Sequence, residues 1–115
     1  MHELAITESV VDLVRDRTGG RRVVAVQLCV GALSGFVPAS MQLCFEIATT
    51  GTPLQGARLD FTEPPGRISC RVCGTEHDIP DAVLLCPCGS ADVVVVSGDE
   101  LRVVSVELER ETTCV

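Results

Sequence analysis

The first thirty residues carry one helical and one extended pattern of apolar side chains. Residues 4–17 repeat apolar positions at helical spacing, which predicts an amphipathic helix. Arginines in the last turn complement the negative end of that helix, and Gly19-Gly20 is expected to end it. Residues 23–30 are rich in Val, which favours a strand because branched side chains fit a pleated surface.

A second helix and a second strand are expected next. Pro38 suits the first position of a helix, and apolar positions recur at helical spacing until Gly51. Apolar and charged residues alternate over residues 57–61, as in a half-buried strand. The stretch 64–66, Pro-Pro-Gly, then interrupts the pattern and marks a boundary.

The last third of the chain holds a Cys-rich segment followed by a return to alternation. Short strands are expected at Ile68 and at Val93–Val96, and residues 104–108 alternate again as a core strand. That strand needs a sheet to satisfy its backbone groups, and the nearest apolar sheet lies before residue 64. We therefore predict an α+β fold in which a zinc-ribbon-like domain, 67–98, is inserted into a domain made of 1–66 and 99–115.

Composition and charge narrow the class of protein. With 115 residues, the chain is long enough for one domain, or for a small domain that carries a smaller module. Its net charge of −7 argues against nucleic acid as a partner, because phosphate binding needs a basic face. No apolar run approaches the roughly 20 residues of a membrane span, and no signal peptide is apparent. We therefore expect a cytoplasmic protein that has no membrane partner and whose seven cysteines stay reduced.

Four cysteines have the spacing of a metal site. Cys70 and Cys73 form a C-x-x-C turn, whereas Cys86 and Cys88 form a shorter C-x-C turn. Two such turns facing each other would enclose a structural Zn(II) with four thiolates. Two alternatives stay open, namely that His77 replaces one thiol, or that C-x-x-C is a redox pair, although no helical pattern follows it. If His77 is no ligand, it is expected to lie in a surface loop.

The remaining three cysteines have simpler interpretations. Cys29 falls within the first predicted strand and Cys44 on the buried face of the second helix, so both are expected to be small core residues. Cys114, near the end of the chain, is expected to be an exposed free thiol.

The chain opens with a second set of metal donors. In Met1-His2-Glu3, the α-amine, the His2 backbone nitrogen and the His2 imidazole can form adjacent chelate rings on one ion. Such a nitrogen-rich set suits Ni(II) or Cu(II) better than Zn(II). No enzyme is expected, because the sequence has no Gly-rich phosphate loop and no Ser or Cys with a general base nearby in the chain.

These features together resemble the HypA/HybF family of hydrogenase nickel-incorporation accessory proteins. The resemblance covers nearly the whole chain and rests on the order and spacing of several short motifs. They are Met1-His2-Glu3-Leu4, the strand and loop at 26–34, Pro38, Phe45-Glu46, Cys70-x-x-Cys73, Cys86-Pro87, and residues 98–107 with the sequence GDELRVVSVE.

The resemblance implies a nickel metallochaperone that serves [NiFe] hydrogenase maturation with a HypB-type GTPase and the hydrogenase large subunit as partners. It implies two helices packed on a three-stranded mixed sheet, with an inserted zinc domain. Its nickel ligands would be Met1, His2 and Glu3, the last through its backbone nitrogen. Its structural zinc ligands would be Cys70, Cys73, Cys86 and Cys88. An adaptor built on a zinc ribbon, without nickel transfer, is the alternative function.

Overall fold

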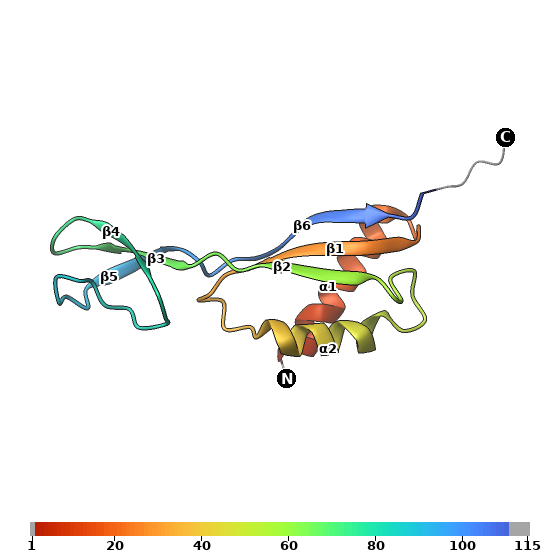
Figure 1. The fold of residues 1–115 in the computed structure, drawn as a ribbon, viewed down its shortest axis with the longest axis horizontal. Helices are drawn as coiled ribbons and strands as arrows, with labels where there is room; N and C mark the ends of the chain where they lie inside the picture. Colours follow the sequence, from red (N-terminus) through yellow and green to blue (C-terminus); the bar gives the residue numbers. More distant parts are fainter. Residues whose placement is uncertain (1, 111–115) are drawn as a thin grey trace. The chain divides into compact units, whose positions relative to one another are not determined.

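In the computed structural model, the backbone of residues 2–110 and the side chains of residues 3–110 are described. Within these residues, two helices and six strands follow one another (Figure 1). They are α1 (His2–Thr18), β1 (Val23–Val30), α2 (Pro38–Thr49), β2 (Arg58–Thr62), β3 (Gly66–Cys70), β4 (Glu76–Ile79), β5 (Val93–Ser97) and β6 (Leu101–Leu108). Between residues 2 and 110, neither helix has the length and apolarity needed to cross a membrane.

The residues divide into two compact units. Of the described residues, the first unit contains those up to Leu28, Val37–Asp60 and those from Val103 onward, and the second contains Cys29–Phe36 and Phe61–Arg102. The second unit thus takes in residues on both sides of the predicted 67–98 segment, together with the loop that follows β1. The limits 1–66, 99–115 and 67–98 stay a prediction.

The first unit has the α+β architecture that the sequence predicts. Its mixed sheet has the order β2-β1-β6, so that β6 pairs beside β1 although most of the chain separates them. Helices α1 and α2 pack against each other (Figure 1). Their buried side chains are mainly aliphatic, as the scarcity of aromatic residues requires: Val10, Val11, Val14, Met41 and Phe45.

Each helix buries one polar side chain beside its apolar ones. In α1, Thr7 is buried, and its hydroxyl donates to the backbone oxygen of Glu3, so this polar side chain is satisfied inside the helix. In α2, Thr49 is buried in the same way, with its hydroxyl donating to the Phe45 oxygen at 2.7 Å. Cys44, predicted as a core residue, is half-buried, whereas Cys29 is buried.

The second unit contains an antiparallel sheet with the order β4-β3-β5. Its central strand carries Ile68, which is fully buried and pairs with His77 on β4 and Val95 on β5. Strand β4 was not predicted, because Ile79 is its sole apolar residue. The expectation that His77 lies in a surface loop is therefore wrong, since this residue is half-buried within a strand.

Three glycines allow chain segments of the second unit to approach closely. The backbone N–H of Gly31 donates to the oxygen of Glu100 at 2.8 Å, and that of Leu33 donates to the oxygen of Gly98 at 2.6 Å. A Cβ atom on Gly31 would lie 2.1 Å from the Gly98 oxygen, and one on Gly98 would lie 2.5 Å from the Gly66 Cα. Only a residue without a side chain fits at these positions.

Candidate metal centres

The first cysteine turn extends directly from strand β3. Cys70 is the last residue of that strand, and its backbone N–H donates to the oxygen of Thr75 at 2.9 Å. The N–H of Gly74 donates back to the Cys70 oxygen at 3.0 Å, which closes the turn, and Gly74 adopts a positive φ of 75°. The N–H of Cys73 points at the Cys70 sulfur, 3.4 Å away. Both thiols therefore lie on the same side of the turn.

The second cysteine turn is held by a different set of backbone bonds. The N–H of Cys86 donates to the oxygen of Ser90 at 2.9 Å, and the N–H of Gly89 donates to the oxygen of Cys86 at 2.8 Å. Gly89 has a φ of 96°, a conformation that favours glycine. This turn brings both of its sulfurs to the first pair even though it is one residue shorter than C-x-x-C.

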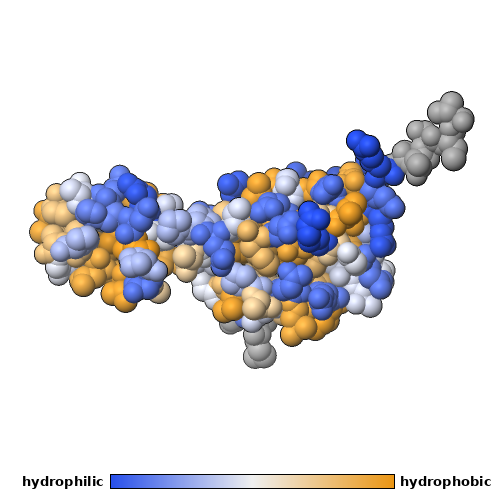
Figure 2. Space-filling view, viewed as in Figure 1, coloured by the Kyte–Doolittle hydropathy of each residue, from blue (hydrophilic) through white to orange (hydrophobic). Residues whose placement is uncertain are grey.

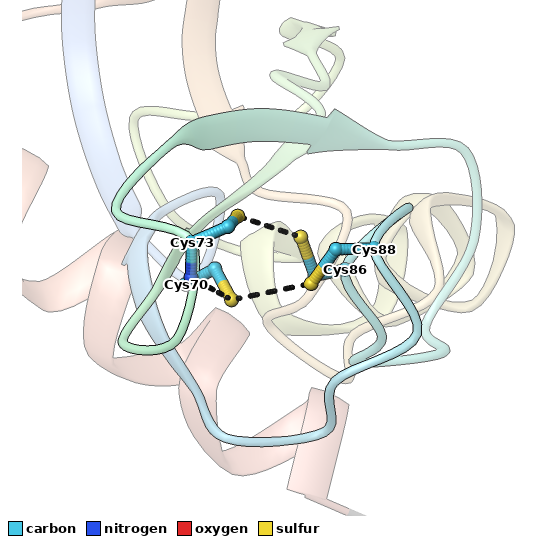
Figure 3. A group of neighbouring side chains, drawn as sticks. All are labelled: Cys70, Cys73, Cys86 and Cys88. Atoms are coloured by element: carbon cyan, nitrogen blue, oxygen red, sulfur yellow. Dashed lines mark hydrogen bonds between the residues drawn. The ribbon is translucent and has the colours of Figure 1, made fainter.

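The four sulfurs form one cluster whose members all lie within 4.8 Å of one another (Figure 3). The Cys70 and Cys88 sulfurs are 3.7 Å apart, and the Cys73 and Cys86 sulfurs are 3.5 Å apart. In a tetrahedral zinc site with Zn–S bonds of about 2.3 Å, neighbouring sulfurs are separated by about 3.8 Å. The cluster therefore has the dimensions of a four-thiolate site. Cys70 and Cys86 are buried, whereas Cys73 and Cys88 are exposed.

The electrostatics of the cluster favour a bound cation. Hydrogen bonds from the side chain and backbone of Thr75 lower the pKa of Cys73 to about 6. The backbone N–H of Cys73 similarly lowers the pKa of Cys70. Although the backbone N–H of Cys88 favours the Cys86 thiolate, burial and the neighbouring thiols raise the pKa of Cys86 to about 12. One sulfur is thus easily ionised while another resists ionisation, and a divalent cation would offset the repulsion among four thiolates.

The donor set also indicates which metal fits. Four thiolates in tetrahedral arrangement suit Zn(II), whereas hard ions such as Mg(II) prefer oxygen ligands. His77 does not join the four sulfurs in the cluster found among residues 2–110, and its Nε2 atom instead contacts the Thr75 hydroxyl at 2.7 Å. The Thr75 hydroxyl oxygen also lies 3.0 Å from the Cys73 sulfur. Both of its partners are two residues away in the sequence, so the spacing Cys73-x-Thr75-x-His77 is a local signal for these contacts.

The predicted nickel donors lie largely outside the described residues. Met1 and the side chain of His2 are not described, while the backbone places His2 at the first position of α1 and Glu3 at the second. The first four N–H groups of a helix have no acceptor within the helix. The backbone nitrogens of His2 and Glu3 therefore have no partner within α1. Cys114 also lies outside the described residues.

Together, these features define a class of small α+β protein in which a second unit carries a four-thiol metal cluster. The chain belongs to the HypA family, described as hydrogenase/urease nickel incorporation metallochaperones, whose profile matches residues 1–108. The family's established role is nickel incorporation during hydrogenase maturation. A metallochaperone carries an ion and is not a catalyst.

Relatives named hydrogenase maturation factor HypA match almost end to end. The protein from Geobacter metallireducens is 48% identical over 110 residues, which cover 95% of this chain and 100% of the relative. The protein from Geobacter sulfurreducens is 44% identical over the same coverage. The solution structure of the nickel metallochaperone HypA from Helicobacter pylori covers 92% of this chain and 96% of its own, with a TM-score of 0.62 and 18% identity. That structure supports the fold.

Proposed function

We propose that this chain binds Ni(II) at its N-terminus and delivers it to a [NiFe] hydrogenase during maturation. The observation that carries the proposal is the family match, which begins at residue 1 and therefore includes Met1-His2-Glu3. Relatives that match over 95% of this chain are named hydrogenase maturation factors. Nickel is the cargo, and a HypB-type GTPase and the hydrogenase large subunit are the proposed partners.

The nickel ligands in this proposal are the Met1 α-amine, the backbone nitrogens of His2 and Glu3, and the His2 imidazole. The start of α1 at His2 supports this set, because its first backbone nitrogens have no acceptor within the helix and stay available to a metal. Ni(II) favours such nitrogen donors in a near-planar arrangement. An acidic side chain at Glu3 suits a helix N-terminus by itself, so its carboxylate is not needed as a ligand.

The second metal in the proposal is a structural Zn(II) held by Cys70, Cys73, Cys86 and Cys88. The sulfur separations of 3.5 and 3.7 Å support this assignment. Thiolate metal ligands persist in reducing compartments, which supports a cytoplasmic location. Zinc here supplies no reaction step; it would link the two cysteine turns and thereby stabilise the second unit.

Nickel titration of the untagged, zinc-loaded protein tests the proposed nickel site. An N-terminal tag converts the amine into an amide, so the tagged protein and a His2→Ala variant should both bind nickel much more weakly. The matched control is Glu8→Gln, which changes an exposed residue of α1 beyond its first turn. Equal nickel binding by tagged and untagged protein would refute the terminal site. Zinc without any specific nickel would instead favour the adaptor function.

Nickel affinity should also fall on mild acidification, because protons compete for the same donors. With reference pKa values of about 6.5 for His and about 7.8 for the amine, lowering the pH from 7.5 to 6.0 reduces their deprotonated fractions about 4-fold and about 20-fold. The affinity should therefore drop by roughly 80-fold, and by more if backbone nitrogens also lose protons. Calorimetry at the two pH values measures this, and unchanged affinity would exclude these ligands.

A further inference from the structure

The Thr75 hydroxyl lies between a cluster cysteine and the histidine of strand β4. Its oxygen is 3.0 Å from the Cys73 sulfur and 2.7 Å from the His77 Nε2 atom. The three side chains therefore form a continuous chain of hydrogen bonds that ends on one metal ligand. His77 itself lies outside the four-sulfur cluster found in the described part of the chain.

Once a metal is bound, the number of available protons determines which group donates and which accepts in each of these two hydrogen bonds. A metal-bound Cys73 is a thiolate and has no proton to donate. Thr75 has a single hydroxyl proton, which must therefore point at the Cys73 sulfur. The Thr75 oxygen can then accept from His77 only if the His77 Nε2 atom carries a proton. The hydrogen bonds thus run from His77 to Thr75 and from Thr75 to Cys73.

We propose that Thr75 and His77 are positioning residues for the metal site, because their hydrogen bonds orient the Cys73 sulfur and stabilise it as a bound thiolate. The proposal rests on the four-cysteine zinc site proposed above. Partners of this kind around metal ligands fix ligand orientation and strengthen metal binding. These hydrogen bonds matter most for Cys73 because it is one of the two exposed ligands and has few packed neighbours to fix its orientation.

Both partners are held in place by the backbone around them. The oxygen of Thr75 accepts a hydrogen bond from the Cys70 N–H at 2.9 Å, which ties Thr75 to the first cysteine turn. His77 is paired with Ile68, a fully buried residue at the centre of the second sheet. On the neighbouring positions of β4, Glu76 and Asp78 form ion pairs with Arg67. Thr75 and His77 are therefore held in position by the first cysteine turn and the β4-β3-β5 sheet.

Zinc affinity of variants, measured by competition with a coloured chelator, tests the proposal. Thr75→Val keeps the branched shape but removes the hydroxyl, and we expect a 10–100-fold loss of zinc affinity. Thr75→Ser restores the hydroxyl and should bind nearly as tightly as wild type. His77→Ala should weaken binding less than Thr75→Val, and His77→Gln, which keeps an N–H donor, should recover part of that loss. The control is Glu63→Gln, an exposed residue outside the second sheet and the hydrogen-bonded series, and it should leave the affinity unchanged.

The absorption of the Co(II)-substituted protein separates positioning from ligation. All variants should keep the intense sulfur-to-metal bands of four thiolates, and loss of that pattern in His77→Ala would overturn the proposal by making His77 a ligand. Equal zinc affinity of Thr75→Val and Thr75→Ser would also overturn it. If Thr75→Val does not fold, the His77→Ala and His77→Gln pair decides in the same way. Wild-type protein that binds no zinc would instead refute the zinc site itself.

Discussion

Chelating the metal should unfold the second unit while the first unit stays folded. The reason is the small apolar core of the second unit. Within residues 61–102 of that unit, the buried apolar side chains are those of Ile68 and Ile79, together with the cluster thiols of Cys70 and Cys86. Figure 2 shows apolar side chains on its surface instead, and the exposed ones are Val72, Val83, Leu84, Leu85, Val94 and Val96.

The magnitudes indicate that metal binding contributes more to the stability of the second unit than the burial of its isoleucine side chains does. Burying two isoleucine side chains contributes about 3–6 kcal/mol in total. A structural zinc ion contributes roughly 10–16 kcal/mol in small zinc peptides. Losing the ion therefore removes more free energy than the two isoleucines supply. The first unit has a separate core around Val14, Leu28, Met41 and Phe45, none of which depends on the cluster.

Amide NMR spectra with and without a strong chelator provide the assay. Resonances of residues in β3, β4 and β5 should collapse to unfolded positions when zinc is removed, while those of α1, α2 and β1 should keep their dispersion. Cys70→Ser should behave like the chelated protein. The matched control is Cys44→Ser, a half-buried cysteine outside the cluster, which should retain both zinc and the second sheet. Protected amides in β3 without metal would refute the reasoning.

Three further predictions concern packing and charge. Gly31→Ala should lower the free energy of unfolding by about 1–3 kcal/mol or more, because its Cβ would lie 2.1 Å from the Gly98 oxygen. The control Ala32→Ser, at an exposed position, should have little effect, and equal urea midpoints for the two variants would contradict the prediction. Phe45→Ala should lower the free energy of unfolding by about 3–5 kcal/mol, measured in the same way. Ile47→Ala, at an exposed position of the same helix, should lower it by less than about 0.5 kcal/mol. Similar losses for the two variants would show that Phe45 is not a core residue. Arg58→Ala breaks an exposed ion pair with Asp60 and should leave the urea midpoint nearly unchanged, because solvent screens exposed charges. A clear loss of stability would indicate an unrecognised role for Arg58.

The resemblance to the family, drawn from short motifs spread along the chain, is confirmed by the family match over residues 1–108. The α+β class is confirmed as well, because helical spacing and alternation are local properties of the chain. The spacing of the cysteine pairs likewise predicted a four-thiol site, and the structure brings those four sulfurs together. The nickel ligands stay a prediction, since Met1 and the His2 side chain lie outside the described residues.

Other features depend on residues that are distant in the chain and so carry no local signal. Strand β4 has one apolar residue, and its pairing with β3 sets His77 opposite Ile68, nine residues earlier in the chain. The close approach of Gly31 to Gly98 also joins segments far apart in sequence. The sequence by itself therefore determined the helices, most strands and the metal-binding residue types, because periodicity and spacing act over a few residues. Only the tertiary structure decided that β4 pairs with β3 and that the two cysteine turns face each other, because these contacts join residues distant in the chain.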